Sequence, residues 1–178
     1  MLRPLASLLV ACLAGQSALS ADNKPDPCTT TAFARDVSHE LAVAKQTPAP
    51  MTAAANADQH VPRLELAKLY QVKLSAQSGV TFALAPGRAK VSEGAQAGLV
   101  RFHTAAPGRY RVALSSGHWI DIVDGEQRIE SSDFQRAHGC ERPHKIVEFV
   151  LPGGKDLTLQ LSGSPDATVM LSVTSVGG

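Results

Sequence analysis

Gly108-Arg-Tyr-Arg-Val-Ala-Leu114 and, after a turn at Gly117, His118-Trp-Ile-Asp-Ile-Val123 decide the fold class of this chain. In the first stretch apolar and polar residues alternate with a period of two, which is typical of a strand with one buried face. The second stretch is apolar on both faces, which indicates a strand with neighbours on both sides. The two stretches together predict a mainly β protein.

The same period extends on both sides of this pair of strands. Further strands are predicted at residues 66–75, 80–84, 99–103, 127–130, 145–151, 157–161 and 169–173. We expect the first two of these to pair as a hairpin across Ser78-Gly79. About eight short strands with a turn signal every eight to twelve residues predict an antiparallel β-sandwich or jelly roll.

The N-terminal third has a different pattern. Between Thr31 and Lys45 apolar residues recur every three or four positions, at Phe33, Val37, Leu41 and Ala44, which predicts one amphipathic α-helix. Proline and alanine are frequent between residues 46 and 63, without a sustained period. We therefore divide the chain into a leader (1–20), an N-terminal arm with helix and Pro/Ala-rich linker (21–63), and a β-sandwich domain (64–178).

The leader has the order of a secretory signal peptide. Arg3 is followed by an apolar run to Ala14 and by small residues before a predicted cut between Ser20 and Ala21. The run is too short for a transmembrane helix, so no transmembrane segment is expected and the mature chain is predicted to be periplasmic or secreted. In the alternative, Leu9-Val-Ala-Cys12 is a lipobox and Cys12 carries a lipid.

Two cysteines, Cys28 and Cys140, remain after the leader. Export brings them into an oxidising compartment, where two lone thiols normally form a disulfide.

The net charge of the chain argues against nucleic acid as a partner. The chain has 17 Lys+Arg and 16 Asp+Glu, and loss of Arg3 with the leader makes it formally neutral. Without a run of basic residues it lacks the charge that nucleic-acid binding needs.

The three strand sequences Gly108-x-Tyr-x-Val-x-Leu, Trp119-Ile-Asp-Ile-Val and Leu157-x-Leu-x-Leu-Ser resemble those of the pre-peptidase C-terminal (PPC-like) β-sandwiches of secreted bacterial enzymes. The chain is also similar to short exported proteins of proteobacteria that combine a Trp-Ile-Asp strand with a following cysteine. The resemblance covers roughly residues 66–174. Some chains of this type carry the label homogentisate 1,2-dioxygenase, which implies a non-haem iron site.

An iron site of that kind needs two histidines and a carboxylate. His118, His138 and His144 are the candidate ligands, for iron or for another divalent metal such as zinc. His118 is followed by Asp124 at the spacing where the dioxygenase family has Glu, and Gly125 indicates that this Asp lies in a turn. Their spacing in the sequence alone does not show that the three histidines lie close together in the fold. The sequence contains no Gly-x-Ser-x-Gly motif, which is typical of serine hydrolases.

Binding residues are predicted in two places. The polar segment from Glu130 to His144 has no strand period and is predicted to be a functional loop, with a loop that only carries Cys140 as the alternative. Its candidate ligand-binding residues are Arg136, His138, Arg142 and His144. Arg109 and Arg111, on one face of their strand, form a second candidate site for a carboxylate or a sulfated sugar, and the alternative is a solvated sheet face. Trp119, the single tryptophan, is expected in the core, with a sugar-stacking platform as the alternative.

These features favour an exported, non-catalytic binding or accessory domain, with no cofactor. Its partner is an unidentified protein or a small-molecule or carbohydrate ligand. Two alternatives stay open: an enzyme with a histidine-based metal site, and a purely structural or interaction domain.

Overall fold

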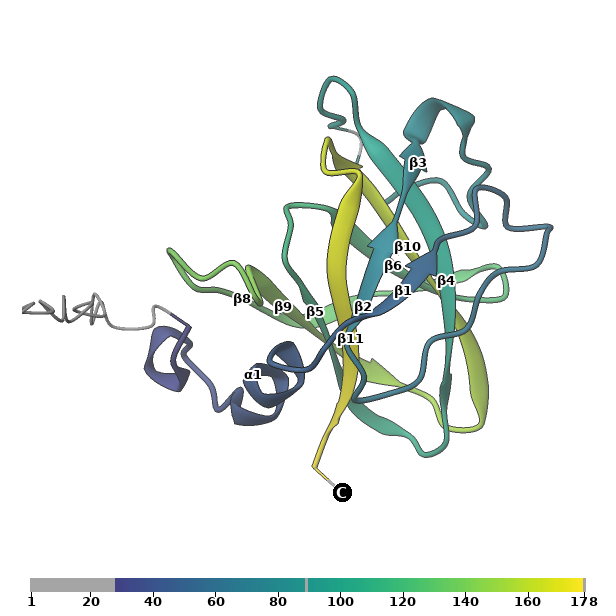
Figure 1. The fold of residues 1–178 in the computed structure, drawn as a ribbon. Helices are drawn as coiled ribbons and strands as arrows, with labels where there is room; N and C mark the ends of the chain where they lie inside the picture. The colour runs from purple at the N-terminus through teal and green to yellow at the C-terminus, as the bar shows by residue number, and fades with distance from the viewer. Residues whose placement is uncertain (1–27, 89, 178) are drawn as a thin grey trace, which may run out of the picture.

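The computed structural model describes residues 28–88 and 90–177, which form two β-sheets packed face to face with a short α-helix beside them (Figure 1). The predicted signal peptide, the Cys12 lipobox and the arm up to Pro27 lie outside the described residues. None of the helices that the described residues form is long and apolar enough to cross a membrane.

The strands divide into a six-stranded and a five-stranded sheet. The first, sheet A, has the order β1 (Ala49–Thr52), β2 (Tyr70–Lys73), β11 (Thr168–Val176), β5 (Gly108–Leu114), β9 (Lys145–Leu151) and β8 (Ser131–Arg136). Sheet B has the order β3 (Ser75–Ala76), β4 (Gln96–Thr104), β10 (Lys155–Ser164), β6 (Trp119–Asp124) and β7 (Gln127–Ile129). The pairs are antiparallel except β1 with β2. The helices are α1 (Ser38–Ala44) and the 3-10 turns η1 (Thr30–Ala32) and η2 (Gln77–Gly79). The predicted β-sandwich with one N-terminal α-helix is confirmed.

The core lies between the two sheets. Val112 and Leu114 of β5 pack into one buried cluster with Leu157, Leu159 and Leu161 of β10. The period of two in both strands therefore marks the faces that meet. β6 pairs with β10 on one side and β7 on the other, as its double-sided apolar pattern predicts.

The hairpin predicted for residues 66–84 is wrong. β2 belongs to sheet A and pairs with β1 and β11, whereas β3 belongs to sheet B, and residues 80–84 form no strand. The reason is a side chain that replaces a strand partner. The Gln160 amide accepts hydrogen bonds from the backbone N–H of Ala83 (2.7 Å) and Leu84 (3.1 Å) and donates to the carbonyl of Leu84 (3.0 Å).

Three other segments also differ from expectation. The predicted loop from Glu130 to His144 contains β8, which forms because its backbone pairs with β9, although none of its side chains is buried. The predicted helix over 31–45 is limited to α1, which begins at Ser38, where the Asp36 carboxylate accepts a hydrogen bond from the Ser38 N–H. The Pro/Ala-rich segment contributes β1 to the edge of sheet A.

The helix lies on the outer face of sheet A. Leu41 of α1 packs with Ala113 of β5 and Ile146 of β9. Phe33 and Val37 join the same cluster from the segment before α1, so this part of the predicted stripe is buried without being helical. The predicted disulfide joins Cys28 to Cys140, with 4.9 Å between the Cα atoms. A structural disulfide of this kind indicates a compartment outside the cytoplasm.

Candidate functional site

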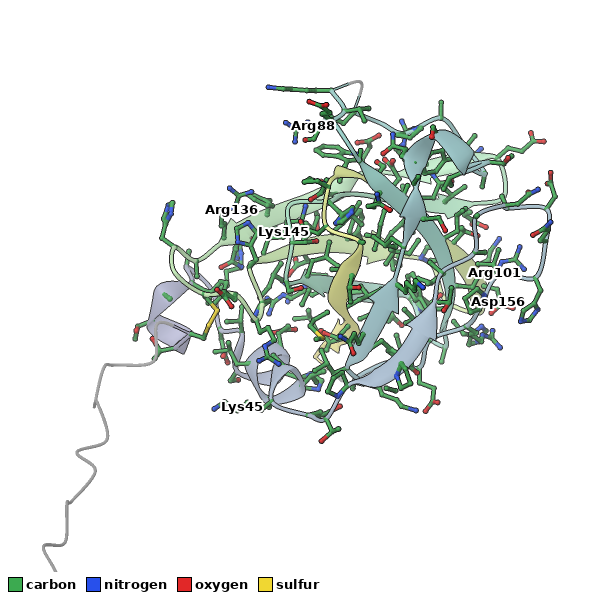
Figure 2. All side chains as sticks on the ribbon, turned by 45° about the horizontal axis from the view of Figure 1, so that its top comes forward. Lys45, Arg88, Arg101, Arg136, Lys145 and Asp156 are labelled. Carbon is green, nitrogen blue, oxygen red and sulfur yellow. A yellow bond between two sulfur atoms is a disulfide. The ribbon has the colours of Figure 1, made fainter. Side chains whose placement is uncertain are left out.

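A cavity of about 240 Å³ opens between β8 and β9 of sheet A and β6 of sheet B. We call it the cationic pocket, and its lining includes Arg88, Trp119, Phe134, Arg136, Lys145 and Val147. Figure 2 labels the three cations, which lie on the side of the molecule away from Arg101 and Asp156.

Strand register puts two of these cations side by side. Arg136 of β8 and Lys145 of β9 are direct partners in the β8–β9 ladder, and Phe134 is the partner of Val147. Lys145 is in phase with Val147 and Phe149, so its side chain lies on the face of β9 that packs into the core. Like charges directly opposite each other on a sheet are destabilising. A basic pair at this position is therefore not explained by folding stability.

A buried carboxylate fixes the opposite wall. Asp121, 2 % exposed, accepts hydrogen bonds from the Trp119 indole N–H (3.1 Å) and the Gly87 N–H (3.0 Å). Arg128 Nε lies 2.9 Å from the same carboxylate, without hydrogen-bond geometry, while its guanidinium donates to the carbonyl of Ala85. The residue before Arg88 must be glycine, because a Cβ at Gly87 would lie 2.8 Å from Asp121 Oδ1. Asp121 thus holds both the Trp119 ring and the loop that carries Arg88.

Each arginine of the pocket lies over an aromatic ring. The guanidinium carbon of Arg88 is 5.9 Å from the ring centre of Trp119, and that of Arg136 is 5.9 Å from the ring centre of Phe134. Both rings are open to solvent, Trp119 at 39 % and Phe134 at 53 % exposure. The predicted core position of Trp119 is therefore wrong, because Asp121 draws its indole N–H to the pocket wall.

The amine of Lys145 is the innermost charge. The residue is 6 % exposed, and Nζ donates a hydrogen bond to the backbone carbonyl of His118. Burial, followed by repulsion from Arg136 and Arg88, lowers the pKa of Lys145 to about 8. Burial and the charges of Arg136 and Lys145 also lower the pKa of His144.

The positive charge of the pocket is uncompensated within the described residues. The pocket lining contains no Asp or Glu, and Arg88, Arg136 and Lys145 form no ion pair there. A larger, more open hollow of about 460 Å³ beside Phe82 and Val91 is lined by no charged side chain. The cationic pocket therefore combines enclosure with a charge that a ligand can neutralise.

Among the sequence-predicted binding residues, Arg136 alone lines this pocket. Arg111 is buried under α1, where its guanidinium donates to Glu148 Oε2 (2.9 Å), Glu40 Oε2 (3.3 Å) and the carbonyl of Asp36 (2.7 Å). Arg109 is exposed, 3.8 Å from Glu148 Oε1. Glu148 and Glu40 therefore neutralise the two arginines of this strand face, in the place of the anionic ligand that was predicted for them.

The predicted histidines lie in unlike surroundings. His118 is fully buried, its Nδ1 is 2.7 Å from Ser116 Oγ, and burial lowers its pKa to about 4. His138 is exposed and His144 half-buried. Within residues 28–88 and 90–177 no three His, Cys, Asp or Glu side chains form a group that could hold a metal ion. Arg142 is exposed and borders a separate hollow with Cys28.

Sequence reasoning did not select Lys145, Arg88 or Phe134. The signal for Lys145 is its phase: in Lys145-Ile-Val-Glu-Phe149 the lysine occupies the same face as Val147 and Phe149. A lysine at a core position of a strand is almost never fully buried unless it is paired with another polar or charged group. Arg88 carries no such signal, because its position depends on the bonds between Asp121 and the preceding loop.

Comparison with known proteins adds little to this geometry. No family model matches the chain, and no curated protein matches it. A beta-glucosidase from Kluyveromyces marxianus, solved in complex with glucose, is similar over 53 % of this chain and 12 % of its own, with 10 % identity and a TM-score of 0.34. The chain thus spans a small part of that enzyme, and a similarity at this level carries no inference about function. The resemblance to PPC-like domains stays a prediction.

Proposed function

We propose that this chain is a periplasmic or secreted, non-catalytic binding module whose cationic pocket takes a small organic anion. The observation that carries the proposal is the convergence of Arg88, Arg136 and Lys145 on one cavity without a carboxylate. Guanidinium and ammonium groups bind carboxylate, sulfate or phosphate through charge-assisted hydrogen bonds, which are about twice as strong as neutral ones. A bound anion offsets the repulsion of Lys145 by Arg136 and Arg88.

The aromatic rings indicate the rest of the ligand. Trp119 and Phe134 present half-open apolar surface at the two arginines. Pockets for small molecules typically combine apolar walls with a few polar groups that fix orientation. We infer an anion attached to an apolar or planar body, such as an arylcarboxylate or a sugar acid, in preference to a free inorganic ion.

Export is part of the same proposal. The Cys28–Cys140 bond supports an oxidising compartment, and the leader with its predicted cut after Ser20 supports transport to it. Intact mass of the protein from its native host tests this, with a mature chain starting at Ala21 as the expected result. A lipid on Cys12 would contradict the soluble form.

Trp119 provides the binding assay, because it is the single tryptophan of the chain and lies in the pocket wall. Titration with phenylacetate is expected to change its fluorescence saturably, whereas phenethylamine, of similar shape and opposite charge, is expected to have no effect. Arg136→Gln is expected to weaken phenylacetate at least about tenfold, since charge-assisted hydrogen bonds contribute about 1.5–3 kcal/mol.

Arg101→Gln is the matched control, because Arg101 is an exposed strand arginine away from the pocket (Figure 2). It is expected to leave the titration unchanged. Equal responses to phenylacetate and phenethylamine, or no response to either, would refute the proposed function.

A further inference from the structure

Lys145 has a property that anion binding alone does not require. Its amine is buried, is hydrogen-bonded to a backbone carbonyl and has no carboxylate partner among the described residues. Desolvation and a neighbouring cation are the two conditions that make a lysine amine nucleophilic toward carbonyl carbon. Lys145 meets both, because Arg136 is its cross-strand partner.

The protonation state of the amine agrees with this geometry. The charged and titratable groups around it are Arg136 of β8, Arg88 of the facing loop, and His144 and His118. The Asp166 carboxylate acts on both histidines. Because the pKa of Lys145 is lowered to about 8, about half of the amine is neutral at that pH. In an exposed lysine the neutral fraction at the same pH is below about 1 %.

We propose that Lys145 captures small 2-oxo acids as a reversible imine, with their carboxylate held by Arg136 and Arg88. This inference rests on the proposed function and names a ligand class for the same pocket. In a 2-oxo acid the carboxylate is bonded directly to the carbonyl carbon. Arg136 and Lys145, which are neighbours on one sheet face, match these two adjacent groups.

The chemical step needs no oxidant or reductant. The lone pair of neutral Nζ attacks the carbonyl carbon, so a C–N bond forms, the C=O π bond breaks, and the carbonyl oxygen takes up a proton in exchange for one lost by Nζ. The resulting carbinolamine breaks its C–O bond, and the hydroxyl leaves as water with a proton that replaces the second one lost by Nζ, while the nitrogen lone pair forms the double bond to carbon. One amine and one carbonyl thus give one imine and one water, and added water reverses the step. The ligand carboxylate offsets the charge of the protonated imine and of the arginines.

Reductive trapping tests the inference on the full mature chain. The protein is incubated with pyruvate and sodium cyanoborohydride near pH 8, then digested and mapped by mass spectrometry. We expect a reduced adduct on Lys145 at least about tenfold above that on the exposed Lys73, with a yield that rises as the pH approaches 8. Lys145→Arg is expected to abolish the adduct, and Lys73→Arg to leave it unchanged.

Acetaldehyde, a carbonyl compound without a carboxylate, distinguishes the role of Lys145 from that of Arg136. Arg136→Gln is expected to reduce trapping of pyruvate while trapping of acetaldehyde on Lys145 continues. If pyruvate changes Trp119 fluorescence saturably but no adduct forms on Lys145, imine formation is refuted and anion binding stands. If pyruvate and phenylacetate both leave the fluorescence unchanged, the proposed function fails as well. Equal labelling of Lys145 and Lys73 would also overturn the inference.

Discussion

Replacement of Lys145 by methionine is expected to stabilise the fold, although it removes one of the three cations proposed to bind the anion. In the folded chain, burial and the charges of Arg136 and Arg88 lower the pKa of this amine from 10.5 to about 8. At about 1.4 kcal/mol per pKa unit, the charged form costs roughly 3 kcal/mol. Loss of the hydrogen bond to the His118 carbonyl offsets part of the gain.

The net expectation for Lys145→Met is a gain of about 1–2 kcal/mol in the free energy of unfolding at neutral pH, or roughly 2–8 °C in Tm. Methionine is an unbranched apolar side chain of similar length, so it fills the same space. Chemical denaturation and calorimetry measure both quantities. Lys73→Met, at an exposed position of β2, is the matched control and is expected to change stability by less than about 0.5 kcal/mol.

The stability difference between wild type and Lys145→Met is expected to change with pH in one direction. Below about pH 8 Lys145 is charged in the folded and in the unfolded chain, so wild type has the full penalty. Between pH 8 and 10.5 the folded chain has lost the proton and the unfolded chain still binds it, so the stability of wild type rises relative to the variant. The advantage of Lys145→Met should therefore shrink over this window. A variant that is less stable than wild type, or an advantage that does not depend on pH, would show that burial of charged Lys145 does not destabilise the fold.

Three further outcomes are expected. Cys28→Ser combined with Cys140→Ser opens a loop with a sequence separation of 112 residues, so we expect a loss of up to about 4–5 kcal/mol in chemical denaturation; an unchanged midpoint would contradict this. Glu40→Ala leaves the buried Arg111 without one of its anions, and about 3 kcal/mol should be lost; a loss below 1 kcal/mol would show that the pair contributes little. Phe134→Ser removes a half-exposed ring, so Tm should stay nearly constant while the affinity for phenylacetate falls more than that for acetate; equal losses would exclude a role for the ring.

Strand positions follow from the sequence wherever one face of a strand is buried. Lys145–Leu151 is predicted with its observed bounds because alternate residues of β9 enter the core. β8 is missed because it is an edge strand whose side chains are mostly exposed, so no apolar period marks it. Residues 80–84 show the opposite error. Their apolar alternation is real, but the Gln160 amide takes the place of a strand partner.

The site is predictable only in part, for a related reason. Arg136 is selected because its segment is polar, and Lys145 is detectable as a charge in phase with core residues. Their proximity depends on the β8–β9 register, which the sequence of either strand does not contain. Arg109 and Arg111 show the limit of charge alone as a signal. They form a basic row in the sequence, but Glu148 and Glu40 neutralise it from other elements.

A heteronuclear NMR titration of the mature, disulfide-bonded chain with phenylacetate tests anion binding in the cationic pocket most directly. We expect saturable shifts of the Trp119 indole N–H and of the backbone amides of Gly117, Ser131 and Val147, which line the cationic pocket. These shifts should disappear in Arg136→Gln. No saturable shift, or shifts confined to the surface around Arg101 and Asp156, would contradict anion binding in this pocket.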